Sequence, residues 1–158
     1  MGNEIAQGQE WNVNSSLDWH LLENEYHQGV QKLTRDLNHQ YLSLNCLYDL
    51  DFEPQGFDWV DCHDSDQSII SFVRRARDGS FAIIVLNFTP VLRPNYRIGV
   101  PNAGNYVEVF NSDAAYYGGS NQGNGGELQT ENVAWMNKAQ SLQITLPPLA
   151  GLILIYKA

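Results

Sequence analysis

The chain has 158 residues, of which 43% are hydrophobic, so it is long enough to bury one good core. With 18 Asp and Glu against 9 Lys and Arg, its formal net charge is -9, which repels phosphate backbones and anionic membrane surfaces. We therefore expect neither nucleic acid nor a membrane as a partner. The longest apolar run, "LPPLAGLILIY", is too short and too broken to span a bilayer, and we expect no signal peptide because the first residues lack a basic flank followed by an apolar core. These features predict a soluble cytoplasmic protein.

The cysteines and histidines give no sign of a metal site. Cys46 and Cys62 stand sixteen residues apart, with no second Cys or His at ligand spacing. A disulfide between them is left open, and two reduced thiols are the simpler interpretation. The four histidines are too scattered to share one face and are interpreted as solvated or capping residues. We therefore expect no metal and no cofactor.

The first part of the chain differs in pattern from the rest. Residues 1–26 have no sustained period and predict a long ordered loop, whereas residues 27–44 predict one amphipathic helix. The apolar residues of this helix recur at steps of three and four: Val30, Leu33, Leu37, Tyr41 and Leu44. Pro54 and Gly56 then break the chain, and we expect a domain boundary near residues 45–56.

Short apolar runs separated by turn residues fill the remainder of the chain. Asp78 and Gly79 stand between two such runs and predict a tight hairpin. Eight short strands with little helix indicate an antiparallel β-sandwich. The expected strands are 57–62, 68–76, 81–89, 95–100, 105–112, 126–135, 141–146 and 151–157.

Three other features each have a structural and a functional interpretation. The glycine-rich stretch "YYGGSNQGNGG" could cradle an anion, but no Lys-Ser or Lys-Thr follows it and strands flank it, so a shaped loop is favoured. Tyr116 and Tyr117 could offer a platform to a sugar ring, although packing is the commoner role.

In the first segment, Glu4, Glu10 and Asp18 could supply the paired carboxylates of glycoside chemistry. A loop alone cannot hold such a pair precisely, so we favour solvated or hydrogen-bonded acids.

Six ordered segments along essentially the whole chain carry a resemblance to one family. They are "MGNEIAQGQEWNVNSSLDWHLLE", "GVQKLTRDLNHQY", "LDFEPQGFDW", "VLNFTPVLRPNYRIGVP", "YYGGSNQGNGG" and "ITLPPLA". Together they resemble the C-terminal end of the bacterial glycogen branching enzymes, which are 1,4-α-glucan branching enzymes of the α-amylase superfamily. The resemblance implies a mainly β fold: a C-terminal antiparallel β-sandwich, residues 45–158, preceded by the tail of a (β/α)8 barrel, residues 1–44. In that tail Met1–Glu4 would end the eighth barrel strand and the helix would be the last of the barrel.

The resemblance also implies a function. The intact enzymes cleave an α-1,4 link, hold the glucan covalently and transfer it to a 6-hydroxyl to form an α-1,6 branch. Their catalytic Asp, Glu and second Asp lie on earlier strands whose motifs do not occur here, and a barrel takes about 250 residues. We therefore expect a fragment that contains no catalytic residues, is inactive alone and has lost the N-terminal barrel as its partner.

The barrel rim implied by the resemblance predicts which residues contact the α-glucan. The expected glucan-lining residues are Asn3, Glu4, Trp11, Asp18 and Trp19, with a tryptophan stacked on a glucose ring and the carboxylates accepting sugar hydroxyls. From about residue 45 onward the expected role is to support the barrel. The alternative is a stand-alone α-glucan-binding module, because aromatic residues make up 11% of the chain.

Overall fold

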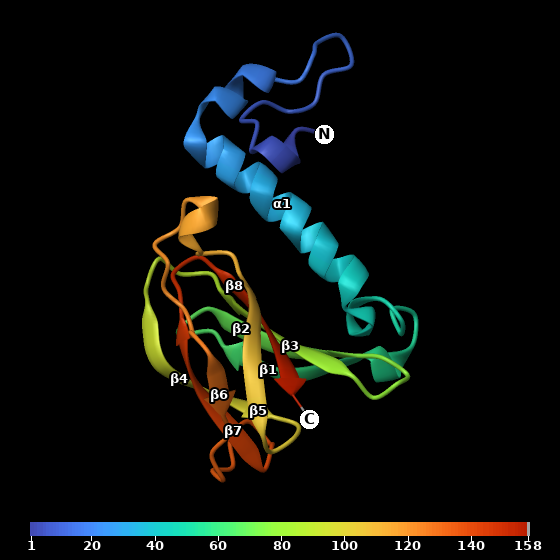
Figure 1. Cartoon of the computed structure of the whole chain (residues 1–158), viewed down its shortest axis with the longest axis vertical. Coiled ribbons are helices and arrows are strands. Elements are labelled where there is room, and N and C mark those ends of the chain that lie inside the picture. The colour runs from blue at the N-terminus through green and yellow to red at the C-terminus, as the bar shows by residue number, and fades with distance from the viewer. Residues whose placement is uncertain (158) are drawn as a thin grey trace.

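Two antiparallel sheets pack face to face and one long helix lies beside them (Figure 1). The computed structural model describes residues 1–157. The larger sheet has the strand order β1-β2-β3-β8-β5-β6, and the smaller sheet pairs β4 with β7. This arrangement confirms the predicted mainly β fold with eight short antiparallel strands. The strands are β1 (Phe57–Asp64), β2 (Ile69–Arg75), β3 (Phe81–Asn87), β4 (Arg93–Val100), β5 (Asn105–Asn111), β6 (Glu127–Gln129), β7 (Gln140–Leu146) and β8 (Gly151–Lys157).

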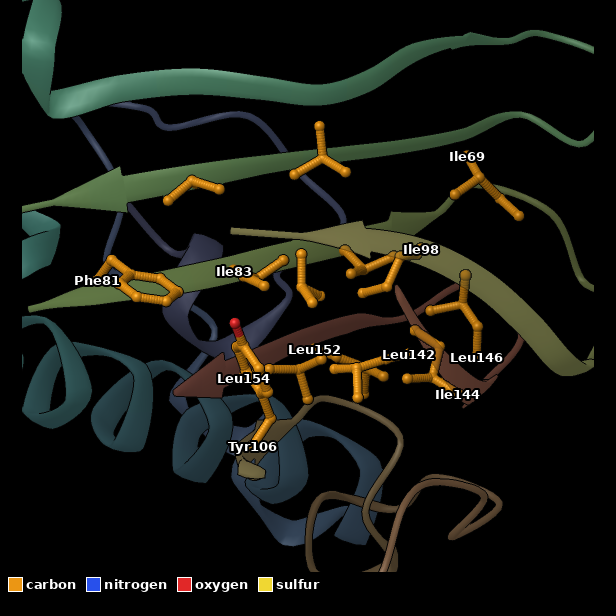
Figure 2. Close-up of a cluster of buried hydrophobic side chains, with 14 residues drawn as sticks. Ile69, Phe81, Ile83, Ile98, Tyr106, Leu142, Ile144, Leu146, Leu152 and Leu154 are labelled. Atoms are coloured by element: carbon orange, nitrogen blue, oxygen red, sulfur yellow. The ribbon is translucent and has the colours of Figure 1, made fainter. Parts of the chain in front are cut away.

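Alternate side chains of the strands form the core between the two sheets, as expected where one face of each strand is buried. In β2, Ile69 and Val73 point inward, whereas the intervening Phe72 faces out and is only partly buried. Figure 2 shows the inward side chains of both sheets meeting in one cluster. The largest fully buried members are Ile69, Ile83, Ile98, Tyr106, Leu142, Ile144, Leu146, Leu152 and Leu154.

The predicted hairpin at Asp78 and Gly79 is present. Arg75 of β2 pairs with Phe81 of β3, and Gly79 has a φ of 86°, which a residue with a side chain rarely adopts. The Asp78 carboxylate accepts a hydrogen bond of 2.8 Å from the Ser80 backbone N–H. The turn residues therefore set the register of these two strands.

The strand expected over residues 126–135 is much shorter in the structure. Only Glu127–Gln129 pair with β5, as β6. After them the chain leaves the larger sheet, because Glu131 makes an isolated bridge to Ser141 of β7. The segment then ends in a tight turn, in which Trp135 pairs with Lys138.

Helix α1 (Glu25–Ser43) corresponds to the helix predicted over residues 27–44. It begins earlier because the Asn24 side chain accepts a 2.9 Å hydrogen bond from the Tyr26 backbone N–H and so caps the helix. Leu33 and Leu44 pack on the outer face of the larger sheet, in a second apolar cluster that contains Phe110. Leu37 remains 45% exposed, so the apolar stripe of α1 is only partly covered.

The segment before α1 forms an ordered layer at the N-terminal end of the helix, away from the sheets (Figure 1). Met1–Glu4, expected to end a barrel strand, pair with no strand among residues 1–157. Asn3–Ile5 form a short 3-10 helix, and the assignment of this segment to a barrel stays a prediction. The 3-10 helices are η1 (Asn3–Ile5), η2 (Trp19–Glu23), η3 (Asn45–Leu47), η4 (Pro54–Gly56) and η5 (Ala115–Tyr117).

Candidate functional site

The N-terminal layer is anchored to α1 through one buried residue. Ile5 is fully buried, and its carbonyl oxygen accepts a 2.7 Å hydrogen bond from Nδ1 of His27 in the first turn of α1. The carbonyl oxygen of Gly2 accepts hydrogen bonds from the backbone N–H groups of Ile5 and Gln7. His27 was expected to be solvated or capping, but it ties the two segments together instead. It does so because the helix start brings its ring beside a turn carbonyl.

Three of the five predicted glucan-lining residues lie in or beside the turns of this layer. Asn3 is exposed in η1, and the Glu4 carboxylate accepts a 3.0 Å hydrogen bond from the Gly2 backbone N–H. The backbone N–H of Asp18 donates to Oε1 of Gln7 at 2.9 Å, which joins the two halves of the loop. Both carboxylates are partly buried and retain oxygens for further hydrogen bonds.

The two tryptophan side chains of the layer are exposed to solvent. Trp11 is 55% and Trp19 54% exposed, so each ring has a free face. Across residues 1–157, no hydrogen bond or ion pair joins any two of the five predicted side chains, Asn3, Glu4, Trp11, Asp18 and Trp19. The structure thus gathers them into one layer but does not link them into a single closed site.

The glycine-rich loop is shaped by two carboxylates. The Asp113 carboxylate accepts hydrogen bonds from the Ser120 and Gln122 backbone N–H groups, at 2.9 and 3.0 Å. The Glu108 carboxylate accepts one from the Asn124 N–H at 2.9 Å. Because the Asp113 and Glu108 carboxylates already accept hydrogen bonds from these backbone N–H groups, the N–H groups are not available to an anion.

Tyr116 and Tyr117 both contact helix α1. Arg35 donates a 3.0 Å hydrogen bond to the Tyr116 hydroxyl, and the Tyr117 hydroxyl donates to Asp36 at 3.1 Å. Burial and the bond to Asp36 raise the pKa of Tyr117 to about 12, so the hydroxyl stays protonated at neutral pH. The packing role therefore accounts for Tyr117, whereas Tyr116 keeps 55% of its surface exposed.

An apolar groove runs between α1 and the outer face of the larger sheet. We call it the helix–sheet groove. It has a volume of about 420 Å³, and its lining includes Leu33, Leu37, Tyr41, Phe72, Ile84 and Leu86. Beside it lie the exposed rings of Phe57 and Trp59, which pack on Phe72 with centroid distances of 5.3 and 6.0 Å. The groove and these rings form a contiguous apolar surface, as is typical of a contact with another protein part.

A larger cavity of about 770 Å³, which was not predicted from the sequence, lies at the start of β4. We call it the β4 cavity; its lining includes Asp61, Asp64, Arg93, Asn95, Tyr96 and Trp135. The residues come from β1, β4 and the turn after residue 134, so no local motif contains them. The one available signal was "RPN", where a proline and an asparagine interrupt an apolar strand pattern.

The described residues contain neither a cluster of metal ligands nor a helix that could span a membrane. Within residues 1–157 no group of three or more His, Cys, Asp or Glu side chains is arranged to hold a metal ion. The same residues contain no helix with the length and apolarity needed to cross a bilayer. Cys46 is a buried free thiol and Cys62 an exposed one, which resolves the question of a disulfide that the sequence left open.

The two-sheet architecture also occurs in a solved structure. It can be superposed on part of the crystal structure of alpha-amylase from H. orenii with a TM-score of 0.52 and 16% identity, covering 93% of this chain and 24% of that one. Residues 59–157 match the family described as the alpha amylase C-terminal all-beta domain. The chain belongs to this family.

Curated relatives match nearly the whole chain. It is 64% identical over 98% of its length to the 1,4-alpha-glucan branching enzyme GlgB of Methylobacillus flagellatus, and covers 21% of that protein. The GlgB proteins of Nitrosomonas eutropha and Cellvibrio japonicus are 59% and 58% identical, again over 98% of the chain and 21% of each protein. The predicted resemblance to branching enzymes is thus confirmed, and the chain spans about a fifth of the length of these relatives.

Proposed function

We propose that this chain works as the C-terminal part of a 1,4-α-glucan branching enzyme, which forms α-1,6 branches in glycogen in the cytoplasm. Residues 1–44 would complete the catalytic barrel, and residues 45–158 would support it. The observation that carries the proposal is the 64% identity to a branching enzyme over 98% of the chain. The catalytic carboxylates would come from the barrel.

The helix–sheet groove supports a contact with the rest of the enzyme. On α1, Leu37, Tyr41 and Leu42 are 45, 44 and 70% exposed. Burying such side chains would stabilise an interface by roughly 25 cal/mol per Å² of apolar surface. The relatives are about five times as long as the stretch they share with this chain, which leaves ample protein to cover the groove.

We further propose that Asn3, Glu4, Trp11, Asp18 and Trp19 line the glucan cleft of the assembled enzyme. The free faces of Trp11 and Trp19 support stacking on glucose rings, since aromatic rings combine apolar area with a polar edge. Glu4 and Asp18 retain carboxylate oxygens that can accept sugar hydroxyls. Their anchorage through Ile5 and Gln7 would hold this rim in place.

A split-enzyme experiment tests the proposal. This chain is mixed with the remaining N-terminal portion of the Methylobacillus flagellatus enzyme, and new branches are followed by iodine staining of amylose. We expect branching from the mixture and none from either piece. A Leu37→Asp chain should weaken reconstitution at least about tenfold, because it places a charge in an apolar interface. Asn38→Asp, an exposed neighbour that does not line the groove, is the matched control. Branching by the N-terminal portion alone would refute the supporting role.

The same assay separates this role from that of a stand-alone glucan-binding module. A Trp11→Ala, Trp19→Ala chain should reconstitute normally but raise the KM for amylose in the assembled enzyme. If the unmixed chain bound maltoheptaose tightly and never restored branching, the stand-alone module would be the better account.

A further inference from the structure

The turn at residues 135–138 holds a tryptophan ring at the edge of the β4 cavity. The backbone groups of Trp135 and Lys138 exchange hydrogen bonds of 3.0 and 2.9 Å. Met136 and Asn137 between them have φ values of 49° and 59°, as both central residues of a type I′ turn require. Gly99 of β4 makes room for this turn, since a Cβ there would lie 2.3 Å from the Trp135 carbonyl oxygen. The turn is therefore fixed to the strand below it.

The ring of Trp135 is nevertheless 47% exposed. A rigid turn that keeps an aromatic side chain half in solvent gains little packing energy from it. Lys138 adds a further restraint on the turn through a 2.9 Å ion pair with Asp58 of β1. A preorganised, exposed aromatic ring is the arrangement that favours ligand contact, because little entropy is lost on binding.

An unpaired cation lies in the same cavity. The ladder between β4 and β7 is irregular between Arg93 and Tyr96, and Asn95 has a φ of 57°. Such a bulge re-aims side chains out of the regular sheet. The Nε of Arg93 is buried without a hydrogen-bond partner, and among residues 1–157 its guanidinium forms no ion pair. Because Nε itself is buried, the donors left to a ligand in the cavity are the terminal guanidinium nitrogens of Arg93, which form no hydrogen bond within residues 1–157.

Hydrogen-bond acceptors line the same cavity. Asp64 accepts a 2.7 Å hydrogen bond from the Tyr96 hydroxyl and a 2.9 Å bond from Nε2 of Gln67. Burial and the bond to Asp64 raise the pKa of Tyr96, so its hydroxyl stays a donor at neutral pH. Asp61, whose carboxylate is bound to the His63 backbone N–H at 3.0 Å, adds a second acid to the lining. The cavity thus combines acids, a cation and an aromatic ring.

This combination selects a neutral ligand. Asp61 and Asp64 would repel an anion and Arg93 would repel a cation, whereas a sugar offers both hydroxyl donors and acceptors and an apolar ring face. We propose that the β4 cavity is a glucan-binding site separate from the N-terminal layer, with Trp135 stacking on a glucose ring and Arg93 donating to sugar oxygens. The choice of an α-glucan as the sugar rests on the proposed function. In the intact enzyme the site would hold the polymer on the sandwich.

The chain itself, titrated with maltoheptaose, provides the test. The indole N–H signals of the four tryptophans are assigned by single Trp→Phe variants and followed by NMR. We expect the Trp135 signal to shift saturably, and Trp135→Ala or Arg93→Gln to weaken binding at least about tenfold, the loss expected for a stacking or charged hydrogen-bond contact. Trp59→Ala is the matched control, because Trp59 is also 47% exposed but lies in an apolar cluster.

Failure of the β4 site and failure of the enzyme assignment give different outcomes. The β4 site would be refuted if the Trp135 NMR signal did not shift at millimolar maltoheptaose. It would also be refuted if the Arg93→Gln variant, shown to be folded by circular dichroism, bound maltoheptaose as tightly as the unchanged chain. Branching by the split enzyme in the same preparation would then leave the proposed function standing. Binding of maltoheptaose at Trp135 without branching by any mixture would support the site and count against the enzyme assignment.

Discussion

Gly29 of helix α1 lies directly against the backbone of Tyr117, where a Cβ at position 29 would come within 2.1 Å of the Tyr117 carbonyl oxygen. Around this approach, Nζ of Lys32 lies 4.9 Å from the ring centroid of Tyr116, and Asp36 accepts a hydrogen bond from Tyr117. Gly29 is the one residue of α1 that is buried. The helix is therefore docked on η5 by close backbone contact as well as by apolar packing.

Gly29→Ala should destabilise the chain, although the same change in an exposed helix stabilises by about 1 kcal/mol. The added Cβ would push the helix from η5, and overpacking of this kind costs about 1–3 kcal/mol. Urea unfolding followed by circular dichroism measures the change. Asn38→Ala, on the exposed side of the same helix, should leave stability unchanged or slightly raised. Equal stability of the two variants would show that the helix can move from η5 without cost.

Asp113→Ala should loosen the glycine-rich loop. The Asp113 side chain is 9% exposed and accepts hydrogen bonds from Ser120 and Gln122, and bonds to a charged acceptor contribute about 1.5–3 kcal/mol. We expect a lower unfolding free energy and faster amide exchange over residues 118–124. Asp66→Ala, at an exposed position, is the control and should change neither measurement. Unchanged exchange in the Asp113 variant would mean that glycine turn geometry alone sets the loop.

The two thiols should react at very different rates in the folded chain. Cys62 is exposed on β1, whereas Cys46 is 3% exposed and burial raises the pKa of its thiol, so little thiolate is available there. An alkylating reagent should modify Cys62 first and Cys46 at least about tenfold more slowly, with both modified in denaturant. Intact mass against time gives the two rates. Rapid double labelling would mean that η3 opens readily, because the reagent cannot otherwise reach Cys46.

Local patterns predicted most of the sandwich. The strand at β2 and the hairpin at Asp78 and Gly79 follow from a short apolar run and from turn chemistry. The turn at Trp135 was missed because it has no glycine and instead uses Met136 and Asn137 at positive φ. The strand predicted over residues 126–135 therefore extended into this turn.

The β4 cavity could not be read from the sequence for a different reason. Asp64 and Tyr96 are hydrogen-bonded to each other although they are 32 positions apart in the chain. Trp135, which lines the same cavity, lies further along the chain than either. No periodicity joins residues so far apart. The five glucan-lining residues expected in the N-terminal layer came from family resemblance, and their role remains a prediction for the assembled enzyme.

Tyr106→Phe should change how stability depends on alkaline pH. Tyr106 is fully buried, its hydroxyl donates to the Asn102 carbonyl oxygen at 2.9 Å, and burial raises its pKa to about 12. In the unfolded chain the pKa is about 10, so the unfolded state loses its proton first as pH rises. The contribution of the protonated Tyr106 hydroxyl to the unfolding free energy is therefore complete below about pH 10 and is lost progressively up to about pH 12.

At neutral pH the Tyr106→Phe variant should lose about 0.5–1.5 kcal/mol with the hydrogen bond. Between about pH 10 and 12 its unfolding free energy should fall less steeply than that of the unchanged chain, so the two curves converge. Urea unfolding at a series of pH values measures both effects. Tyr26→Phe, at a position 63% exposed, should follow the unchanged chain throughout. Parallel curves for Tyr106→Phe and the unchanged chain would mean that the hydroxyl ionises equally easily in the folded and unfolded states.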